Sequence, residues 1–95
     1  MIKIREVFTA KPGMASKLAK LMQESMGNMG GKTTIMTDLV GDYNTVVAEY
    51  EMESMVAFEK MMEDYTKNQK PEEKEKMSGY TDMYMTGRRE IYRIW

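Results

Sequence analysis

The chain has 95 residues, of which 42% are hydrophobic and 31% charged, a composition typical of one globular domain spanning residues 1–95. Its 14 basic and 15 acidic residues give a net charge of −1, which argues against nucleic acid as a partner because no excess of positive charge can neutralise phosphates. The longest apolar run is the four residues 55–58, far short of the ~20 that cross a bilayer, so we expect a cytoplasmic protein with no membrane partner.

Cysteine and histidine are both absent. The sequence therefore offers no disulfide, thiol nucleophile or thiolate metal site, and it lacks the commonest metal ligand and general base. We expect no metal and no cofactor. The 13 methionines are interpreted as an adaptable core or a pliable apolar pocket in preference to a Cu(I) site, because most fall on predicted apolar faces.

The first half of the chain predicts a strand, a helix and a hairpin. Residues 2–9 are rich in β-forming side chains and stop at a Lys-Pro-Gly turn, and residues 14–26 repeat apolar side chains at helical spacing before Gly27. Residues 28–32 form a loop. Residues 33–40 and 45–52 then predict two strands, and the short turn between them favours antiparallel pairing.

The second half predicts two helices and a closing strand. Ser54 caps a helix that runs to about Thr66. Pro71 opens a further helix that Gly87 ends, with a break or kink near Gly79 because an interior glycine costs about 1 kcal/mol relative to alanine. Residues 90–95 form the last strand. The order predicts an α+β, ferredoxin-like βαββαβ sheet, with both long helices on one face and an extra helix before the last strand.

In such a fold the helices cover one side of the sheet and leave the other side bare. Alternation along the strands places an apolar set in the helix-side core: Ile2, Ile4, Phe8, Val46, Ala48, Tyr50 and Met52. The opposite side receives a mixed set: Lys3, Arg5, Val7, Thr9, Val47, Glu49 and Glu51. Glu6 breaks the pattern, because its position would put a carboxylate in the core.

Two interpretations of the bare side stay open. One is a solvated surface with ion pairs such as Arg5 with Glu49 or Glu51, each contributing about 0.2 to 1 kcal/mol. The other is a face closed by a second copy of the chain, because residues 91–95 add more apolar surface than one layer of helices needs.

Closing two such sheets gives a barrel with a partly polar interior. A carboxylate held there is desolvated, which raises its pKa toward neutrality and supplies a general base to an enzyme without histidine. Glu49 and Glu51 are therefore candidate catalytic bases. Arg5 is the candidate that holds one of them ionised or binds an anionic substrate.

The candidate ligand contacts near the end of the chain are Tyr80, Tyr84 and Arg88. Tyr80 and Tyr84, one helical turn apart near the predicted kink, could line a ligand entrance. Arg88 together with Arg89 could clamp a carboxylate or phosphate, although such a pair more often matches the negative end of a helix. The glycine-rich residues 27–33 lack the spacing and the strand-to-helix order of a phosphate loop, so they do not predict nucleotide binding.

Several stretches together carry a resemblance that covers nearly the whole chain: Arg5-Glu6, Lys11-Pro12-Gly13, residues 47–51, Ala57-Phe58-Glu59 and residues 87–94. On these the chain resembles the dimeric α+β barrel superfamily, and within it the small NIPSNAP-like and antibiotic-biosynthesis-monooxygenase-like proteins. The resemblance implies a homodimer whose two four-stranded sheets form one barrel, with a cavity between sheet and helices or inside the barrel. Haem-using members ligate iron through histidine, which this chain lacks.

The superfamily hosts many chemistries, so the resemblance does not decide the activity. The leading hypothesis is a homodimer that binds a small apolar molecule, and whether it also transforms that molecule without a cofactor, as monooxygenase-like and isomerase-like members do, stays open. The alternative is a non-catalytic dimeric domain that binds a ligand or another protein.

Overall fold

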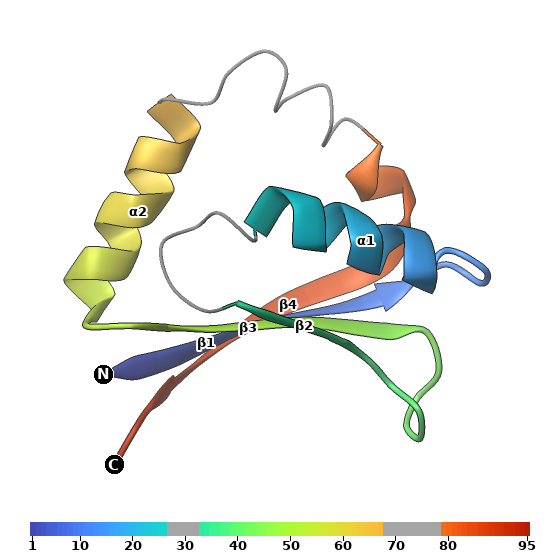
Figure 1. The fold of residues 1–95 in the computed structure, drawn as a ribbon, viewed down its shortest axis with the longest axis horizontal. Coiled ribbons are helices and arrows are strands. Elements are labelled where there is room, and N and C mark those ends of the chain that lie inside the picture. Colours follow the sequence, from blue (N-terminus) through green and yellow to red (C-terminus); the bar gives the residue numbers. More distant parts are fainter. Residues whose placement is uncertain (27–32, 68–78) are drawn as a thin grey trace.

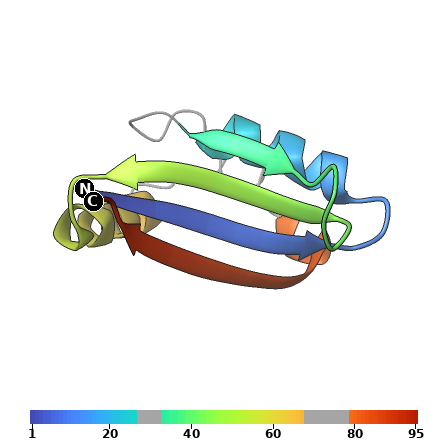
Figure 2. The same ribbon diagram turned by 90° about the horizontal axis from the view of Figure 1, so that it is seen from below.

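A computed structural model describes residues 1–26, 33–67 and 79–95. The elements run β1 (Ile2–Ala10), α1 (Ala15–Met26), β2 (Thr34–Thr37), β3 (Thr45–Met52), α2 (Met55–Lys67), the 3₁₀ helix η1 (Tyr80–Asp82) and β4 (Tyr84–Arg93). The strands form one antiparallel sheet in the order β2-β3-β1-β4. Both α-helices lie on one side of this sheet (Figure 1), and the opposite side is bare of described helices (Figure 2). The predicted ferredoxin-like α+β fold is confirmed.

The hydrophobic core lies between the sheet and the two helices. Leu18 and Met22 of α1 pack with Ala48 of β3, while Phe58 of α2 packs with Ile4 of β1. Each large apolar side chain buried in this way contributes about 1.5 to 3 kcal/mol. The predicted alternation of strand residues between the two sides of the sheet is confirmed, and the pairing of β1 with both β3 and β4 fixes which residues of each strand share a side.

Helix α2 begins where its cap was predicted. The Ser54 hydroxyl oxygen accepts a hydrogen bond from the Ala57 backbone N–H at 3.2 Å, which satisfies one of the free donors at the helix start. Among the described residues, no helix combines the length and the apolar character needed to span a membrane.

Strand β2 is shorter than the predicted strand over residues 33–40, because Asp38 starts a turn. Its carboxylate accepts hydrogen bonds from the backbone N–H of Tyr43 at 2.8 Å and of Thr45 at 3.0 Å. Tyr43 and Asn44 adopt positive φ angles of 67° and 58° within this turn. The predicted hairpin is present, and its turn exposes Leu39 fully. The loop predicted at residues 28–32 lies outside the described residues.

The predicted helix between Pro71 and Gly87 is wrong over its described part. Residues 80–82 form a single 3₁₀ turn and β4 already begins at Tyr84. Gly87 lies within β4 opposite Phe8, and a Cβ atom there would come within 2.8 Å of the Phe8 ring. The glycine therefore makes room for an aromatic ring and does not end a helix. Residues 71–78 lie outside the described residues.

Candidate functional site

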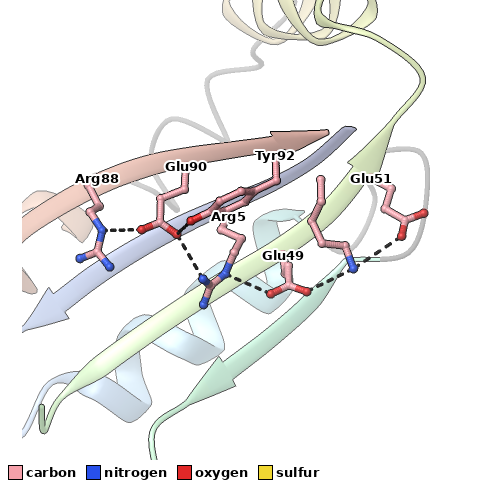
Figure 3. A network of polar contacts seen from close by, with 7 residues as sticks. Arg5, Glu49, Glu51, Arg88, Glu90 and Tyr92 are labelled. Atoms are coloured by element: carbon pink, nitrogen blue, oxygen red, sulfur yellow. Dashed lines mark hydrogen bonds and ion pairs between the residues drawn. The ribbon is translucent and has the colours of Figure 1, made fainter. Parts of the chain in front are cut away.

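The bare side of the sheet carries a row of alternating charges that crosses β3 and β1 (Figure 3). Arg5 lies opposite Glu49 in the ladder, with its Nε 3.2 Å from the Glu49 Oε2. The other Glu49 oxygen lies 3.3 Å from Lys3 Nζ, which also approaches Glu51 at 3.5 Å. The hydrogen bond to Glu49 is the main cause that raises the pKa of Lys3. Lys3, Glu49 and Glu51 also line a polar hollow of about 290 Å³.

The row continues across β4. Arg5 Nη1 donates to Glu90 Oε1 at 3.1 Å, and Arg88 Nε donates to Glu90 Oε2 at 2.9 Å. The Tyr92 hydroxyl also donates to Glu90 Oε1 at 3.1 Å. The hydrogen bonds from Arg88 and then Tyr92 are the main causes that lower the pKa of Glu90. We call this row of seven residues the charge row: Lys3, Arg5, Glu49, Glu51, Arg88, Glu90 and Tyr92.

The structure thus brings the three candidate catalytic residues into one network, as their strand positions predicted. Each oxygen of Glu49 lies within ion-pair distance of a cation, Oε1 of Lys3 and Oε2 of Arg5. Arg5 Nε is buried and forms no aligned hydrogen bond, although it lies within ion-pair distance of Glu49. The role of Glu49 and Glu51 as catalytic bases stays a prediction.

The helix side of the sheet holds a second polar cluster, built around Glu6. Arg89 Nε donates to Glu6 Oε1 at 2.6 Å, and the Tyr50 hydroxyl donates to the same oxygen at 3.3 Å. No described residue contacts Glu6 Oε2 within hydrogen-bonding distance. The Arg89 guanidinium stacks over the Phe58 ring at 5.1 Å. Burial, and after it the charge of Glu6, raises the pKa of Tyr50.

Glu6, Tyr50 and Arg89 line a cavity of about 160 Å³ between the sheet and the two helices. Its other walls are mainly rings and thioethers: Phe8, Tyr65, Tyr80, Met22, Met26 and Met62. An apolar cavity with a few convergent polar groups is the usual form of a small-molecule site. The helix-side cavity is therefore the strongest candidate site in the described part of the chain.

The candidate ligand residues divide between the two sides of the sheet. Tyr80 lines the helix-side cavity, and its ring centroid lies 5.4 Å from that of Tyr84. The prediction that these tyrosines lie one turn apart on a helix is wrong, because Tyr84 belongs to β4. Burial, followed by a hydrogen bond to Tyr84, raises the pKa of Tyr80.

A clamp made jointly by Arg88 and Arg89 is also wrong. Consecutive residues of a strand point to opposite faces of the sheet, so Arg88 joins the charge row while Arg89 binds Glu6 on the helix side. Both lie within β4, so the reading of this pair as a helix-end charge match fails as well.

The pairing of Glu6 with Arg89 at the helix-side cavity is the feature of the site that sequence reasoning missed. The signal for Glu6 was its break in the alternation of β1, which placed a carboxylate at an inward position. Arg89 was predicted only as a partner of Arg88 in an anion clamp, because its inward position follows from the true start of β4 at Tyr84 and from its register with Glu6. In residues 1–26, 33–67 and 79–95 no three His, Cys, Asp or Glu side chains converge in a way that could hold a metal ion.

Comparison with models of known protein families gives no match, and comparison with curated proteins gives none either. Solved structures do match. An uncharacterized NIPSNAP domain protein from Burkholderia xenovorans has a TM-score of 0.82 at 12% identity, over 100% of this chain and 95% of that one. A NIPSNAP family protein of unknown function from Agrobacterium tumefaciens has a TM-score of 0.83 at 12% identity, over 99% of this chain and 87% of that one.

A putative antibiotic biosynthesis monooxygenase from Chloroflexus aurantiacus has a TM-score of 0.71 at 11% identity, over 99% of this chain and 93% of that one. At these identities the likeness shows a shared fold. It confirms, at the level of the fold, the resemblance to NIPSNAP-like and antibiotic-biosynthesis-monooxygenase-like proteins.

Proposed function

We propose that this chain is a cytoplasmic homodimer that binds a small organic molecule in the cavity on the helix side of its sheet. The observation that carries the proposal is Glu6, a carboxylate only 12% exposed that lies with Arg89 and the Tyr50 hydroxyl in a cavity lined mainly by rings and thioethers. Placing a charged group there costs several kcal/mol unless it is paired, and a hydrophobic side chain of similar volume would pack without that cost. A ligand that binds to the Glu6 carboxylate would explain why a charged residue occupies this position.

Methyl-group NMR tests this site directly, because three methionines line the cavity and others lie elsewhere. In protein labelled with ¹³C at the methionine methyls, small ring compounds at millimolar concentration are expected to shift the signals of Met22, Met26 and Met62. The signals of Met36 on β2 and Met55 on α2 should stay in place, since neither residue lines the cavity. Shifts at Met36 alone, or no shift with any compound, would contradict the proposal.

The homodimer forms, in this proposal, through the bare side of the sheet. Val7 of β1 and Val47 of β3 pair in the ladder and are both buried, although neither belongs to the helix-side core clusters of the described residues. The three cations and three anions of the charge row pair with one another, so a second copy would cover charges that already have partners. The β2–β3 turn and the C-terminal end of the chain both lie on this side of the sheet (Figure 1), and they bring exposed Leu39 and Trp95 to its rim.

Sedimentation velocity at micromolar concentration tests the dimer with a matched pair of variants. Met36 on β2 is 38% exposed and Met55 on α2 is 46% exposed, so the same substitution probes two different surfaces at similar exposure. The wild-type chain and Met55→Lys should sediment as dimers, whereas Met36→Lys should sediment as a monomer. A monomeric wild-type chain would rule out the dimer.

Conversion without a cofactor of a small molecule held at the bare side of the sheet, apart from the helix-side cavity, is the second candidate function, supported by the fold shared with proteins named antibiotic biosynthesis monooxygenase. In this reading Glu49 or Glu51 is the base and Arg5 its electrostatic partner. Glu49→Gln should then abolish turnover while leaving the methionine methyl shifts unchanged. Equal turnover by wild type and Glu49→Gln would exclude Glu49 as the base.

A further inference from the structure

We propose that the ligand of the helix-side cavity is an uncharged molecule of about one six-membered ring, with a hydroxyl group that donates a hydrogen bond to Glu6 Oε2. This inference rests on the proposed function, because it takes that cavity as the ligand site. It adds the size, the charge and the hydrogen-bonding character of the ligand.

The size follows from the cavity volume of about 160 Å³. A protein cavity of about 150 Å³ holds one benzene molecule. The space, which is partly open to solvent, therefore accommodates one ring with a small substituent.

The walls favour a ring over a flexible chain. Phe8, Tyr65 and Tyr80 present aromatic surfaces, and Met22 and Met26 present polarizable thioethers. Sulfur atoms and aromatic rings attract each other by about 0.3 to 1.5 kcal/mol per contact, and aromatic rings pair edge to face or with an offset. Methionine side chains also adjust to the outline of different rings.

The charges of the lining require a neutral ligand. Glu6 and Arg89 are the charged residues among the described lining of the cavity, and they pair with each other at 2.6 Å. An anionic ligand would meet the Glu6 carboxylate in a poorly solvated space, which is unfavourable. A cationic ligand would have to compete with Arg89 for the same carboxylate. Because Glu6 and Arg89 neutralise each other, the cavity has no net charge that would attract an anionic or a cationic ligand.

The carboxylate itself requires a hydrogen-bond donor. Arg89 and Tyr50 both donate to Glu6 Oε1, and no described residue donates to Oε2. A ligand hydroxyl can replace the donor that water offers this solvent-accessible oxygen, whereas a purely apolar ring would displace water without replacing its hydrogen bond. Tyr50 and Arg89 act here as positioning residues, because they hold Oε1 and so fix where Oε2 lies.

The experiment measures dissociation constants by the methionine methyl shifts for five probes: phenol, cyclohexanol, anisole, benzene and benzoate. Phenol or cyclohexanol should bind at least about tenfold more tightly than anisole and benzene, which fill the same space without a donor, a difference of about 1.4 kcal/mol. Benzoate should cause no shift. The tighter of the two hydroxyl compounds shows whether the natural ligand carries an aromatic or a saturated ring.

Glu6→Met should remove the preference for a hydroxyl, so that phenol and anisole bind equally, while Glu24→Met on the exposed side of α1 should retain it. The comparison of the five probes on the wild-type chain stands even if Glu6→Met fails to fold. Equal binding of all the neutral rings, or tightest binding of benzoate, would overturn this inference and leave the cavity as a binding site. Absence of methyl shifts with every probe would instead overturn the proposed function.

Discussion

Glu6 and Arg89 lie opposite each other in the β1–β4 ladder, separated by 83 residues in the sequence, and the Arg89 Nε donates to the Glu6 Oε1 at 2.6 Å. The two partners differ in exposure, since the Glu6 side chain is 12% exposed and the Arg89 side chain 42%. The arginine can therefore turn to solvent without its partner, whereas the carboxylate cannot.

This difference predicts unequal effects of removing either partner. Arg89→Met should lower the free energy of unfolding by about 2 kcal/mol, because it leaves a nearly buried carboxylate with only the Tyr50 hydroxyl. Glu6→Met should cost less than about 1 kcal/mol, and the double variant should recover most of the loss, because an apolar pair avoids the desolvation of both charges. Urea denaturation of the wild type, the two single variants and the double variant measures these differences as a double-mutant cycle. Equal losses for the two single variants would contradict the inferred burial of Glu6.

Gly87 is predicted to be intolerant of any side chain. Gly87→Ala would place a Cβ within 2.8 Å of the Phe8 Cδ1, so the Phe8 ring would have to shift from its packing against the Tyr84 ring, whose centroid lies 4.9 Å away. We expect a loss of about 1 to 3 kcal/mol in thermal or urea denaturation. Gly79→Ala is the control, because its Cβ would meet only a flexible methionine end at 3.9 Å and its φ is −101°. Similar losses in the free energy of unfolding for both variants would show that contact between the new Cβ and the Phe8 ring does not cause the destabilisation.

Tyr50 is predicted to make the protein less stable in alkali. Its folded-state pKa is raised above the ordinary value of 10.0, so the folded chain keeps a proton that the unfolded chain loses. This stabilisation is fully present below pH 10.0 and is lost as the pH rises above that value. One proton accounts for a slope of up to about 1.4 kcal/mol per pH unit.

Tyr50→Phe should reduce the alkaline slope of the free energy of unfolding by that amount, and Tyr43→Phe, whose side chain is exposed, should leave the slope unchanged. The raised pKa values of Tyr80 and Lys3 act in the same direction and remain in both variants. Urea denaturation on either side of pH 10.0 measures the slopes. An unchanged slope in Tyr50→Phe would show that Tyr50 ionises in the folded chain as it does in the unfolded one.

Asp38 is predicted to hold the β2–β3 turn in its strained shape. Asp38→Ala removes the acceptor of two backbone N–H groups and should cost about 1 to 2 kcal/mol, because Tyr43 and Asn44 then keep positive φ angles without that support. Asp42→Ala in the same turn removes an equal charge from a residue that makes no hydrogen bond or ion pair with the described residues, and it should be nearly neutral. Chemical denaturation measures the free energy of unfolding of both variants. Equal losses would show that the turn does not depend on the hydrogen bonds of Asp38.

The strands were predictable where alternation was regular. Residues 45–52 divide between core and bare side as their sequence indicated, and Arg5 meets Glu49 because antiparallel neighbours in register share a side of the sheet. The helix cap at Ser54 followed from local chemistry, which a few neighbouring residues determine. The end of the chain was misread because Tyr80, Met83 and Tyr84 fit a helical spacing as well as the turn and strand they form.

The sequence by itself determined the fold class, the two sides of the central strands, and the exclusion of cysteine and histidine chemistry, since these depend on composition and on short-range periodicity. Only the tertiary structure decided that Glu6 has a partner, that this partner is Arg89 and not Arg88, and that the pair borders a cavity between sheet and helices. The register of β1 with β4 sets these relationships. A shift of one residue in that ladder would exchange the faces of Arg88 and Arg89, and no local pattern fixes a pairing across 83 residues.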